Sequence, residues 1–583
     1  MAGGVRNLMG RVFAAFAAPA GAALLVSCGG GGGGGGTSLS FPVSVKVAGL
    51  TQGTLQLVEG NGNDSVTVDG SSTTTTRFPT QIAAGSLYYV KVVQQPQGMN
   101  CVVLGGAGAA NGNVIVNVVC SPSSASPAPA AAQWTWMAGF QMQSPVGSYG
   151  AVGVPGGFPG ARYGAASWTD EVGNLWLFGG DTVVSGSAVG FFNDLWKYDT
   201  ASGTWTWWGP AVSANTPYQA GVSIADSGYS SYPGARIFAS TWFNTGTGQA
   251  WLFGGYGCGE GSGACSSSTV QLQNDLWTFT PSGGWTLVPG GSSSSPNSYP
   301  GARFGAATWI DSGGNLWLFG GSGVAVDGTS GDLGDLWEYN PRTKTWTKVS
   351  GPSSASTTPP SGTNTCSQSS PPARQNAASW FDGANLWLFG GAVGSGSYSS
   401  STETFYADLW EYVPSSGSWK CWPGNPPVAG GNSLSYTPAA RYEAVSWVDP
   451  NTHYFWLYGG EGYTGPGAGN GTPGYFNDLW YFDPKALSGS PGIVQQWTQV
   501  SVSDTEGGCT TMPGGSNTGV PPRWCPGIYG SQGASATSNL PGARYGSVGW
   551  VDANGDFWLF GGDGYGVGSQ SVGSLNDLWR YTP

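Results

Sequence analysis

One module recurs six times in this chain, and this recurrence constrains the fold more than any other feature. Each copy begins with a proline, two small residues and an arginine, as in PGARYGAASW, PGARIFASTW and PPARQNAASW. An apolar segment ending in two glycines follows, as in NLWLFGG or YFWLYGG, and a variable loop then leads to DLW. Recurrence of this kind indicates a repeat architecture in which neighbouring units bury a shared core.

Composition favours β-strands joined by long uncharged loops. Charged residues are 9% of the 583 residues, whereas glycine occurs 102 times and tryptophan 29 times. Turn formers and aromatic residues at this level are typical of an all-β protein. The net charge of −12 argues against binding to nucleic-acid phosphates, because such binding depends on clustered lysine and arginine.

The double glycine after the second predicted strand, together with the aromatic residues spaced through the third and fourth, resembles the kelch repeat. The resemblance covers residues 133–583. It implies an all-β fold, a six-bladed kelch β-propeller with one four-stranded blade for each repeat, preceded here by a smaller module.

The tryptophans predict how this ring closes. All six repeats have a tryptophan in the first, second and third strands, but only five have one in the fourth, at Trp205, Trp285, Trp346, Trp419 and Trp497. The sixth is supplied by Trp134 in QWTW, ahead of the first repeat. We therefore expect the first strand of the propeller to complete the last blade, which removes the exposed sheet edges.

The N-terminus resembles a bacterial lipoprotein signal. Arg6 and Arg11 precede an apolar run that ends in LVSC, and eight glycines follow Cys28. The resemblance implies a signal peptide over residues 1–27, lipidation of Cys28 and a flexible tether over 28–37. It implies lipid anchoring in a bacterial cell envelope, at the outer membrane, the cell surface or in the periplasm. The alternative is a plain secretory signal with an incidental cysteine.

Residues 38–120 contain short alternating runs such as VSVKV and DSVTVDG, which predict a small β-sandwich. The module loosely resembles immunoglobulin-like modules of bacterial surface proteins, and we interpret it as a spacer. A Pro/Ala/Ser linker follows at 121–132.

Eight cysteines remain besides Cys28, an even number that is typical of exported proteins. Their proximity in sequence suggests pairing Cys101 with Cys120, Cys258 with Cys265, Cys366 with Cys421, and Cys509 with Cys525. Only the first pairing has independent support, because CVVL and VNVVC can form a hairpin that places its two cysteines opposite each other.

The repeat arginines and the aspartates of DLW should meet at one rim of each blade, because adjacent strands run antiparallel. The glycines between them leave room for a guanidinium to cross the second strand and reach the carboxylate. The alternative is a cationic ring that holds an anionic ligand. The arginines are Arg162, Arg236, Arg303, Arg374, Arg441 and Arg544, and the aspartates are Asp194, Asp275, Asp335, Asp408, Asp478 and Asp577.

The long connections emerge on the arginine rim, which makes that face the predicted binding face. Flat aromatic rings in these loops suit contacts with sugars or protein loops. The alternative is that these loops have changed in length without acquiring a binding role. Acidic positions just past the double glycine (Asp181, Glu461 and Asp563) are suited to accept hydrogen bonds from hydroxyls, although such residues more often face solvent. The candidate contact residues are Tyr229, Tyr232, Tyr256, Tyr299, Tyr398, Tyr463, Trp524, Tyr529 and Tyr565.

A single histidine, His453, argues against histidine-based metal or general-base chemistry. Galactose oxidase shares the kelch propeller but holds copper with two histidines, so its activity is not expected here. We therefore expect a monomeric, non-catalytic binding protein without metal or cofactor, whose ligand is a protein or a glycan. The alternative is a sugar mutarotase or epimerase, similar to the bacterial sialic-acid mutarotase, which is also a kelch propeller.

Overall fold

The computed structural model describes residues 40–59, 64–70, 75–83, 87–94, 96, 99–104, 107–109, 112–122, 132–184, 188–209, 232–259, 270–289, 298–358, 365–394, 403–422, 437–463, 473–485, 497–501, 510–511, 523–567 and 572–583. Strands make up nearly all of the regular structure in these residues, which confirms the all-β prediction. Within the same residues, no helix is long and apolar enough to span a membrane. The proposed signal, Cys28 and the glycine tether lie outside the described residues.

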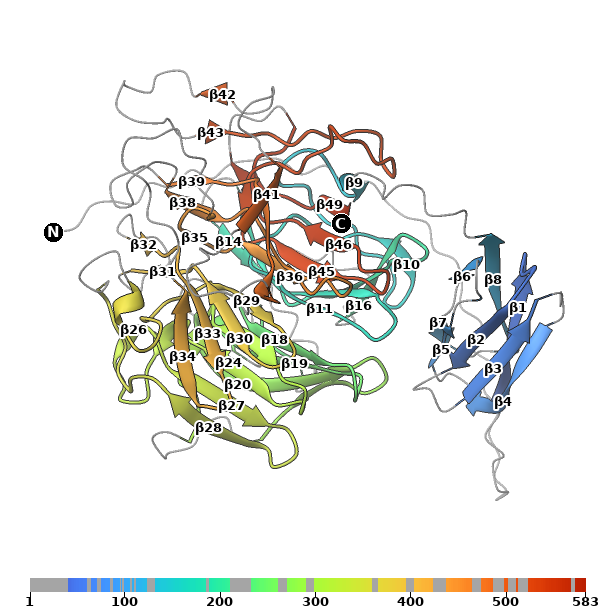
Figure 1. Ribbon diagram of the computed structural model, residues 1–583, viewed down its shortest axis with the longest axis horizontal. Coiled ribbons are helices and arrows are strands. Elements are labelled where there is room, and N and C mark those ends of the chain that lie inside the picture. The colour runs from blue at the N-terminus through green and yellow to red at the C-terminus, as the bar shows by residue number, and fades with distance from the viewer. Residues whose placement is uncertain are drawn as a thin grey trace, which may run out of the picture.

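The N-terminal module contains two four-stranded sheets around one core (Figure 1). One sheet has the order β4-β1-β8-β6 and the other β3-β2-β5-β7. Valines and leucines at alternate positions of both sheets fill the space between them, as the period-2 pattern predicts. The strands are β1 (Ser40–Ala48), β2 (Thr54–Glu59), β3 (Asp64–Asp69), β4 (Thr75–Ala83), β5 (Leu87–Gln94), β6 (Met99–Leu104), β7 (Ala107–Ala109) and β8 (Val114–Pro122).

Cys101 and Cys120 lie opposite each other in the β6–β8 register and form a disulfide. A second disulfide joins Cys366, in the 3-10 turn Thr365–Ser367, to Cys421. Cys258 and Cys525 are also disulfide-bonded, and their predicted partners, Cys265 and Cys509, lie outside the described residues. The likeness of the N-terminal module to immunoglobulin-like modules stays a prediction.

Six of the antiparallel sheets in the described residues that follow are here called blades 1 to 6 (Figure 1). Blade 1 contains β11 (Ala166–Thr169), β12 (Leu175–Phe178), β15 (Leu195–Asp199) and β16 (Thr204–Gly209), with β10 (Pro155–Gly157) beside β16. Blade 2 contains β18 (Ser240–Asn244), β19 (Gln249–Gly257), β20 (Gln271–Thr280) and β21 (Gly284–Leu287). Blade 3 contains β23 (Ala307–Ile310), β24 (Leu316–Phe319), β27 (Leu336–Asn340) and β28 (Thr345–Ser350).

Blade 4 contains β29 (Ala378–Phe381), β30 (Leu386–Phe389), β33 (Leu409–Val413) and β34 (Ser418–Trp422). Blade 5 contains β36 (Val445–Val448), β37 (Phe455–Tyr458), β40 (Leu479–Phe482) and β41 (Trp497–Ser501). Blade 6 contains β45 (Val548–Val551), β46 (Phe557–Phe560), β49 (Leu578–Thr582) and β9 (Gln133–Ala138). The first strand of each blade contacts the first strands of both neighbours, and β45 of blade 6 returns to β11 of blade 1. The sheets therefore form a closed propeller.

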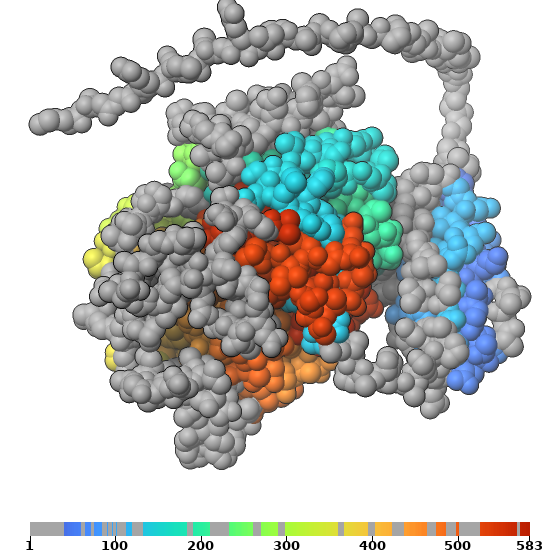
Figure 2. Space-filling model, turned by 90° about the horizontal axis from the view of Figure 1, so that it is seen from above, coloured from blue at the N-terminus to red at the C-terminus, as the bar shows by residue number. Residues whose placement is uncertain are grey.

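The strand that precedes the first repeat completes the last blade. In β9, Trp134 lies opposite Tyr581 of β49, and Trp136 lies opposite Trp579. Figure 2 shows this early segment, in cyan, next to the red C-terminal segment. The Trp134 side chain is 3% exposed and packs among Trp447, Tyr458 and Tyr581. Blade 6 thus gains its fourth strand from the opposite end of the repeat region.

Hairpins continue five of the blades past the double glycine, on the face that carries the repeat arginines, here called the arginine face. They are β13 (Asp181–Val184) with β14 (Ala188–Phe191), β25 (Ser322–Val324) with β26 (Ser330–Asp332), β31 (Ala392–Val393) with β32 (Thr404–Phe405), β38 (Glu461–Tyr463) with β39 (Pro473–Tyr475), and β47 (Asp563–Gly564) with β48 (Gly573–Ser574). Short strands β17 (Arg236–Ile237), β22 (Arg303–Phe304), β35 (Arg441–Tyr442) and β44 (Arg544–Tyr545) pair beside these extensions or beside the longer β19.

The double glycine is required where adjacent blades meet. Gly179 has a φ of 68°, and a Cβ there would lie 2.6 Å from the carbonyl oxygen of Arg236 in the next blade. Gly180 donates its N–H to the same carbonyl at 3.0 Å. A larger residue would push the blades apart, so this motif follows from backbone contact between blades.

Candidate functional site

The repeat arginines are buried within the blades. Each is 1% exposed, and each forms a bidentate pair with the aspartate of its own repeat. In blade 1, Nη1 of Arg162 donates to Asp194 Oδ1 at 2.6 Å and to the Gly179 carbonyl at 2.9 Å. Asp194 also accepts the indole N–H of Trp196 at 2.7 Å. These guanidiniums hold the blade together and do not face an anionic ligand.

Two of these carboxylates, Asp335 and Asp275, have lowered pKa values. Burial alone would raise the pKa of Asp335, but the adjacent Arg303 guanidinium outweighs burial and holds the pKa below 3.8. The same balance lowers the pKa of Asp275 beside Arg236. These two pairs are therefore salt bridges at neutral pH.

Three of the aromatic residues predicted to contact a ligand are instead packed into the propeller. Tyr232 is 9% exposed and packs against Phe178 and Trp285. Tyr299 packs against Phe253 and Trp346. The Tyr529 hydroxyl donates to Asp577 Oδ2 at 2.5 Å, while its ring lies 4.8 Å from Trp579. Tyr232 and Tyr299 thus fill space between neighbouring blades, and Tyr529 packs against blade 6.

The other predicted contact residues have different positions. Tyr256 and Tyr565 are half-buried on the arginine face, where Tyr565 lies 6.0 Å from Tyr475. Tyr463 lies in β38 and Trp524 in β43 (Arg523–Trp524), and their side chains lie outside the described part of the structure. Tyr229 and Tyr398 also lie outside the described residues.

A ring of six backbone hydrogen bonds closes the propeller axis near the arginine face. Each member has a φ between 50° and 64° and donates its N–H to the carbonyl of its neighbour, at 2.7 to 3.2 Å. The members of this axial amide ring lie two residues after the repeat arginine: Gly164, Phe238, Gly305, Asn376, Glu443 and Gly546. The ring returns to its start because Gly164 donates to Gly546 and Gly546 donates to Glu443.

Carboxylates and tyrosines gather on the arginine side of the axial amide ring. Tyr163 donates to Asp181 at 3.1 Å, Tyr442 to Glu461 at 3.0 Å and Tyr545 to Asp563 at 3.4 Å. The Tyr545 ring lies 6.2 Å from that of Tyr163 and 6.5 Å from that of Tyr442. Nearby, Asn376 Nδ2 donates a hydrogen bond to Glu443 Oε1 at 2.9 Å. We call Glu443 and the six residues of these tyrosine–carboxylate pairs the axial cluster.

Each of three carboxylates in the axial cluster has one buried oxygen without a hydrogen-bond partner in the structure. These atoms are Oδ1 of Asp181, Oε2 of Glu443 and Oδ1 of Asp563. The residues are 2%, 9% and 8% exposed. Buried acceptors are usually satisfied, so three orphaned oxygens at one place indicate a site that accepts hydrogen bonds from a ligand.

The electrostatics of the axial cluster raise the pKa values of its acids above their usual range. Burial raises the pKa of Asp181 and of Asp563 to about 6, although their tyrosine partners act in the opposite direction. Burial raises the pKa of Glu443 well above 4.5, and the carboxylates of Glu461, Glu403 and Asp563 raise it further. Burial also raises the pKa of the Tyr442 and Tyr545 phenols, which therefore remain hydrogen-bond donors.

Sequence reasoning named Asp181, Glu461 and Asp563 as acidic positions past the double glycine, but it missed Glu443 and the three tyrosines. The repeat pattern contained a signal that could have identified Glu443. The position two residues after the arginine is glycine in three repeats, and a glutamate there is an unusual occupant of a positive-φ site.

Among the described residues, no group of three or more histidine, cysteine or carboxylate side chains is arranged to hold a metal ion. His453 lies exposed in the turn between β36 and β37, with a φ of 63°. That turn joins the first and second strands of blade 5, on the face opposite the repeat arginines.

Comparison with known proteins finds similarity to a family model and to solved structures. The family described as the KLHDC2/KLHL20/DRC7 Kelch-repeats domain matches residues 147–367. Among solved structures, the one described as "Structure of YjhT" has 14% sequence identity, covers 74% of this chain and 95% of that chain, and has a TM-score of 0.41. No curated protein matches the chain. Residues 147–367 therefore match a kelch-repeat family, and the same module recurs through residue 583.

Proposed function

We propose that this protein binds a hydroxyl-rich ligand, a neutral or amino-substituted glycan, at the axial cluster on its arginine face. The observation that carries the proposal is the set of buried carboxylate oxygens without partners on Asp181, Glu443 and Asp563. A sugar offers several O–H donors within a few ångströms of one another, which matches several fixed acceptors.

Charge and ring geometry narrow the ligand class. The repeat arginines are buried and paired, so the nearby cations are already neutralised by aspartates. The unpaired side chains of the axial cluster are acidic, which disfavours carboxylated or phosphorylated ligands. The phenol faces of Tyr442 and Tyr545, with an interplanar angle of 22°, suit contact with the apolar face of a sugar.

A lipid anchor through Cys28 would hold this face at a cell-envelope surface, with residues 38–120 as a spacer. The tripartite N-terminal pattern and the glycine run support this part of the proposal. Cys28→Ser should move the protein from the membrane fraction to the soluble fraction. A variant that remains membrane-associated would contradict lipid anchoring at this residue.

Binding is tested with a glycan array probed by the full chain. Glu443→Gln keeps the side-chain volume but changes the hydrogen-bonding groups, so glycan binding should be lost or weakened about tenfold, which corresponds to about one hydrogen bond. Glu171→Gln is the matched control, because Glu171 lies in the turn between β11 and β12 on the opposite face. No glycan binding, or binding that Glu443→Gln leaves unchanged, would refute the proposal.

A second candidate is conversion of a sugar, either mutarotation or epimerisation. The observation that favours it is the pKa of about 6 for Asp181 and for Asp563, which permits proton exchange near neutral pH. NMR of a freshly dissolved sugar anomer distinguishes the two candidates. Catalysed equilibration that Asp181→Asn abolishes would establish the enzyme, whereas binding without acceleration supports the glycan-binding protein.

A further inference from the structure

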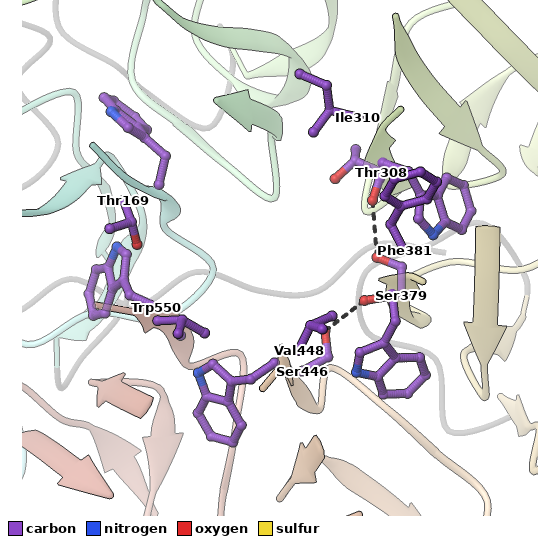
Figure 3. A pocket seen from close by; sticks show the side chains of 14 residues that line it. Thr169, Thr308, Ile310, Ser379, Phe381, Ser446, Val448 and Trp550 are labelled. Atoms are coloured by element: carbon purple, nitrogen blue, oxygen red, sulfur yellow. Dashed lines mark hydrogen bonds between the residues drawn. The ribbon is translucent and has the colours of Figure 1, made fainter. Parts of the chain in front are cut away.

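The propeller axis contains a second site, below the axial amide ring and open to the face opposite the arginines. The first strands of the blades run side by side from the arginine face, so residues at increasing distance after each arginine form successive layers along the axis. The axial amide ring is the first layer. Hydroxyl residues form the second, and a cavity lies beyond them (Figure 3).

The axial amide ring lies between this cavity and the arginine face, as a floor three residues before the hydroxyl layer along the first strands. Its six members donate to one another in a complete circle, so their N–H groups are all used within the floor. The polar groups of the axial cluster lie on the other side of this floor. The cavity and the axial cluster are therefore separate sites on one axis.

The second layer is a belt of hydroxyl groups that bond to backbone carbonyls of the preceding blade. Ser446 donates to the Ser379 carbonyl at 3.2 Å, Ser379 to Thr308 at 3.2 Å and Thr308 to Thr241 at 3.2 Å. Figure 3 shows two of these bonds at the wall of the cavity. Because their donors are engaged, these hydroxyls present their carbon atoms and an acceptor lone pair to the cavity.

The wall is formed largely by indoles whose N–H groups are also engaged. Trp309, Trp380 and Trp447 each donate to a backbone carbonyl of the next blade, at 3.1 to 3.2 Å. Trp550 closes the same pattern by donating to the Trp176 carbonyl in blade 1 at 3.0 Å. These bonds fix the rings and leave mainly carbon surface toward the axis.

The mouth of the cavity is apolar. Ile310, Phe381, Val448 and Val551 lie there with Thr169, and none of the described lining residues is titratable. The cavity volume is about 340 Å³, within the usual range for small-molecule sites. A charged ligand would lose its hydration without gaining a partner, so the walls select against ions.

From these features we infer that the channel is a binding site for a small, uncharged, mainly apolar ligand. The axial amide ring lies between this site and the arginine face, and the walls offer fixed aromatic surface. The polar groups of the walls already have hydrogen-bond partners, so the ligand needs to supply few hydrogen bonds. This site is independent of the proposed glycan site, because no residue of the axial cluster lines it.

Fluorescence of N-phenyl-1-naphthylamine, a neutral apolar probe, tests the inference on the full chain. We expect saturable enhancement with one site per chain, and energy transfer to the probe from the surrounding tryptophans. Its sulfonated analogue, 1-anilinonaphthalene-8-sulfonate, should bind at least about tenfold more weakly because of its charge. Absence of saturable binding by the neutral probe, or equal binding of both probes, would overturn the inference.

Two variants locate the probe. Thr169→Trp should fill the mouth and reduce affinity for the neutral probe about tenfold or more. The matched control Leu287→Trp adds the same side chain at a 40% exposed position of β21 and should bind like the parent. If Thr169→Trp fails to fold, Ile310→Arg replaces it, and it should weaken the neutral probe while strengthening the sulfonate. Binding of the neutral probe that persists unchanged in a folded mouth variant would also overturn the inference.

Discussion

Replacing Trp134 by alanine should loosen the whole ring, because this side chain belongs to the strand that joins its two ends. The indole is 3% exposed and has four aromatic neighbours, including Tyr581 at 5.0 Å and Tyr458 at 5.3 Å. Truncating a buried tryptophan to alanine lowers the free energy of unfolding by about 3–5 kcal/mol. We expect the upper part of that range, since aromatic pairs contribute beyond their buried area.

A second variant, Trp134→Phe, separates the effect of lost packing from that of the indole N–H. Its ring keeps most of these contacts, and it removes an indole N–H that is buried without a hydrogen-bond partner in the structure. Relief of that orphaned donor offsets part of the lost volume, so we expect a loss below about 2 kcal/mol. Urea unfolding followed by tryptophan fluorescence measures both variants against the parent.

Trp497→Ala provides the matched control for ring closure. Trp497 is also 3% exposed and also begins a fourth strand, but β41 is joined to its own blade through the chain. Both alanine variants should lose similar stability. Only Trp134→Ala should release β9 and expose Met137 and its neighbours to limited proteolysis. If Trp134→Ala retained the parent's unfolding free energy within about 1 kcal/mol and gained no cleavage in β9, closure by this strand would be refuted.

Two further predictions concern charge. Arg544→Lys should lower the free energy of unfolding by about 3–5 kcal/mol, because lysine cannot replace the bidentate pair with Asp577. The control is Arg580→Lys, which should change stability by less than about 1 kcal/mol, because Arg580 is 35% exposed and lies 3.7 Å from Asp556. Equal melting temperatures for both variants would contradict the structural role of the repeat arginine. Stability should fall as pH rises through about 6, because Asp181 and Asp563 keep their protons to higher pH in the folded protein than in the unfolded chain, where the pKa is near 3.8. Each carboxyl contributes about 3 kcal/mol to this fall. Thermal melts of the double variant Asp181→Asn with Asp563→Asn should show a flatter profile between pH 4 and 7.

Features that recur in every module could be predicted from the sequence, because each copy repeats the same physical constraint. Six arginines and six aspartates at fixed positions indicated their pairing, and the missing fourth-strand tryptophan indicated Trp134. The same logic, applied further, would have placed Tyr232 and Tyr299 in the core. Both precede their repeat arginine by four residues, so they occupy a blade position and not a free loop.

The candidate site was harder to predict because it consists of departures from the repeat. Glu443 stands where three of the other repeats have glycine, and the carboxylates of blades 1, 5 and 6 approach one another only after the ring closes. A linear sequence gives no distance between Asp181 and Asp563, which are separated by nearly the whole propeller. The channel was likewise hidden, because its walls are ordinary blade tryptophans seen from the axis.

The circular course of the axial amide ring has a consequence for the field along the axis. In a helix the peptide dipoles align, and their sum attracts anions at one end. Here the dipoles follow one another around a circle, so their vector sum is close to zero. The floor therefore adds little potential of its own to either side. Under the proposed function, the carboxylates above the ring would select the ligand, while an uncharged guest in the channel below would meet no net dipole from the ring.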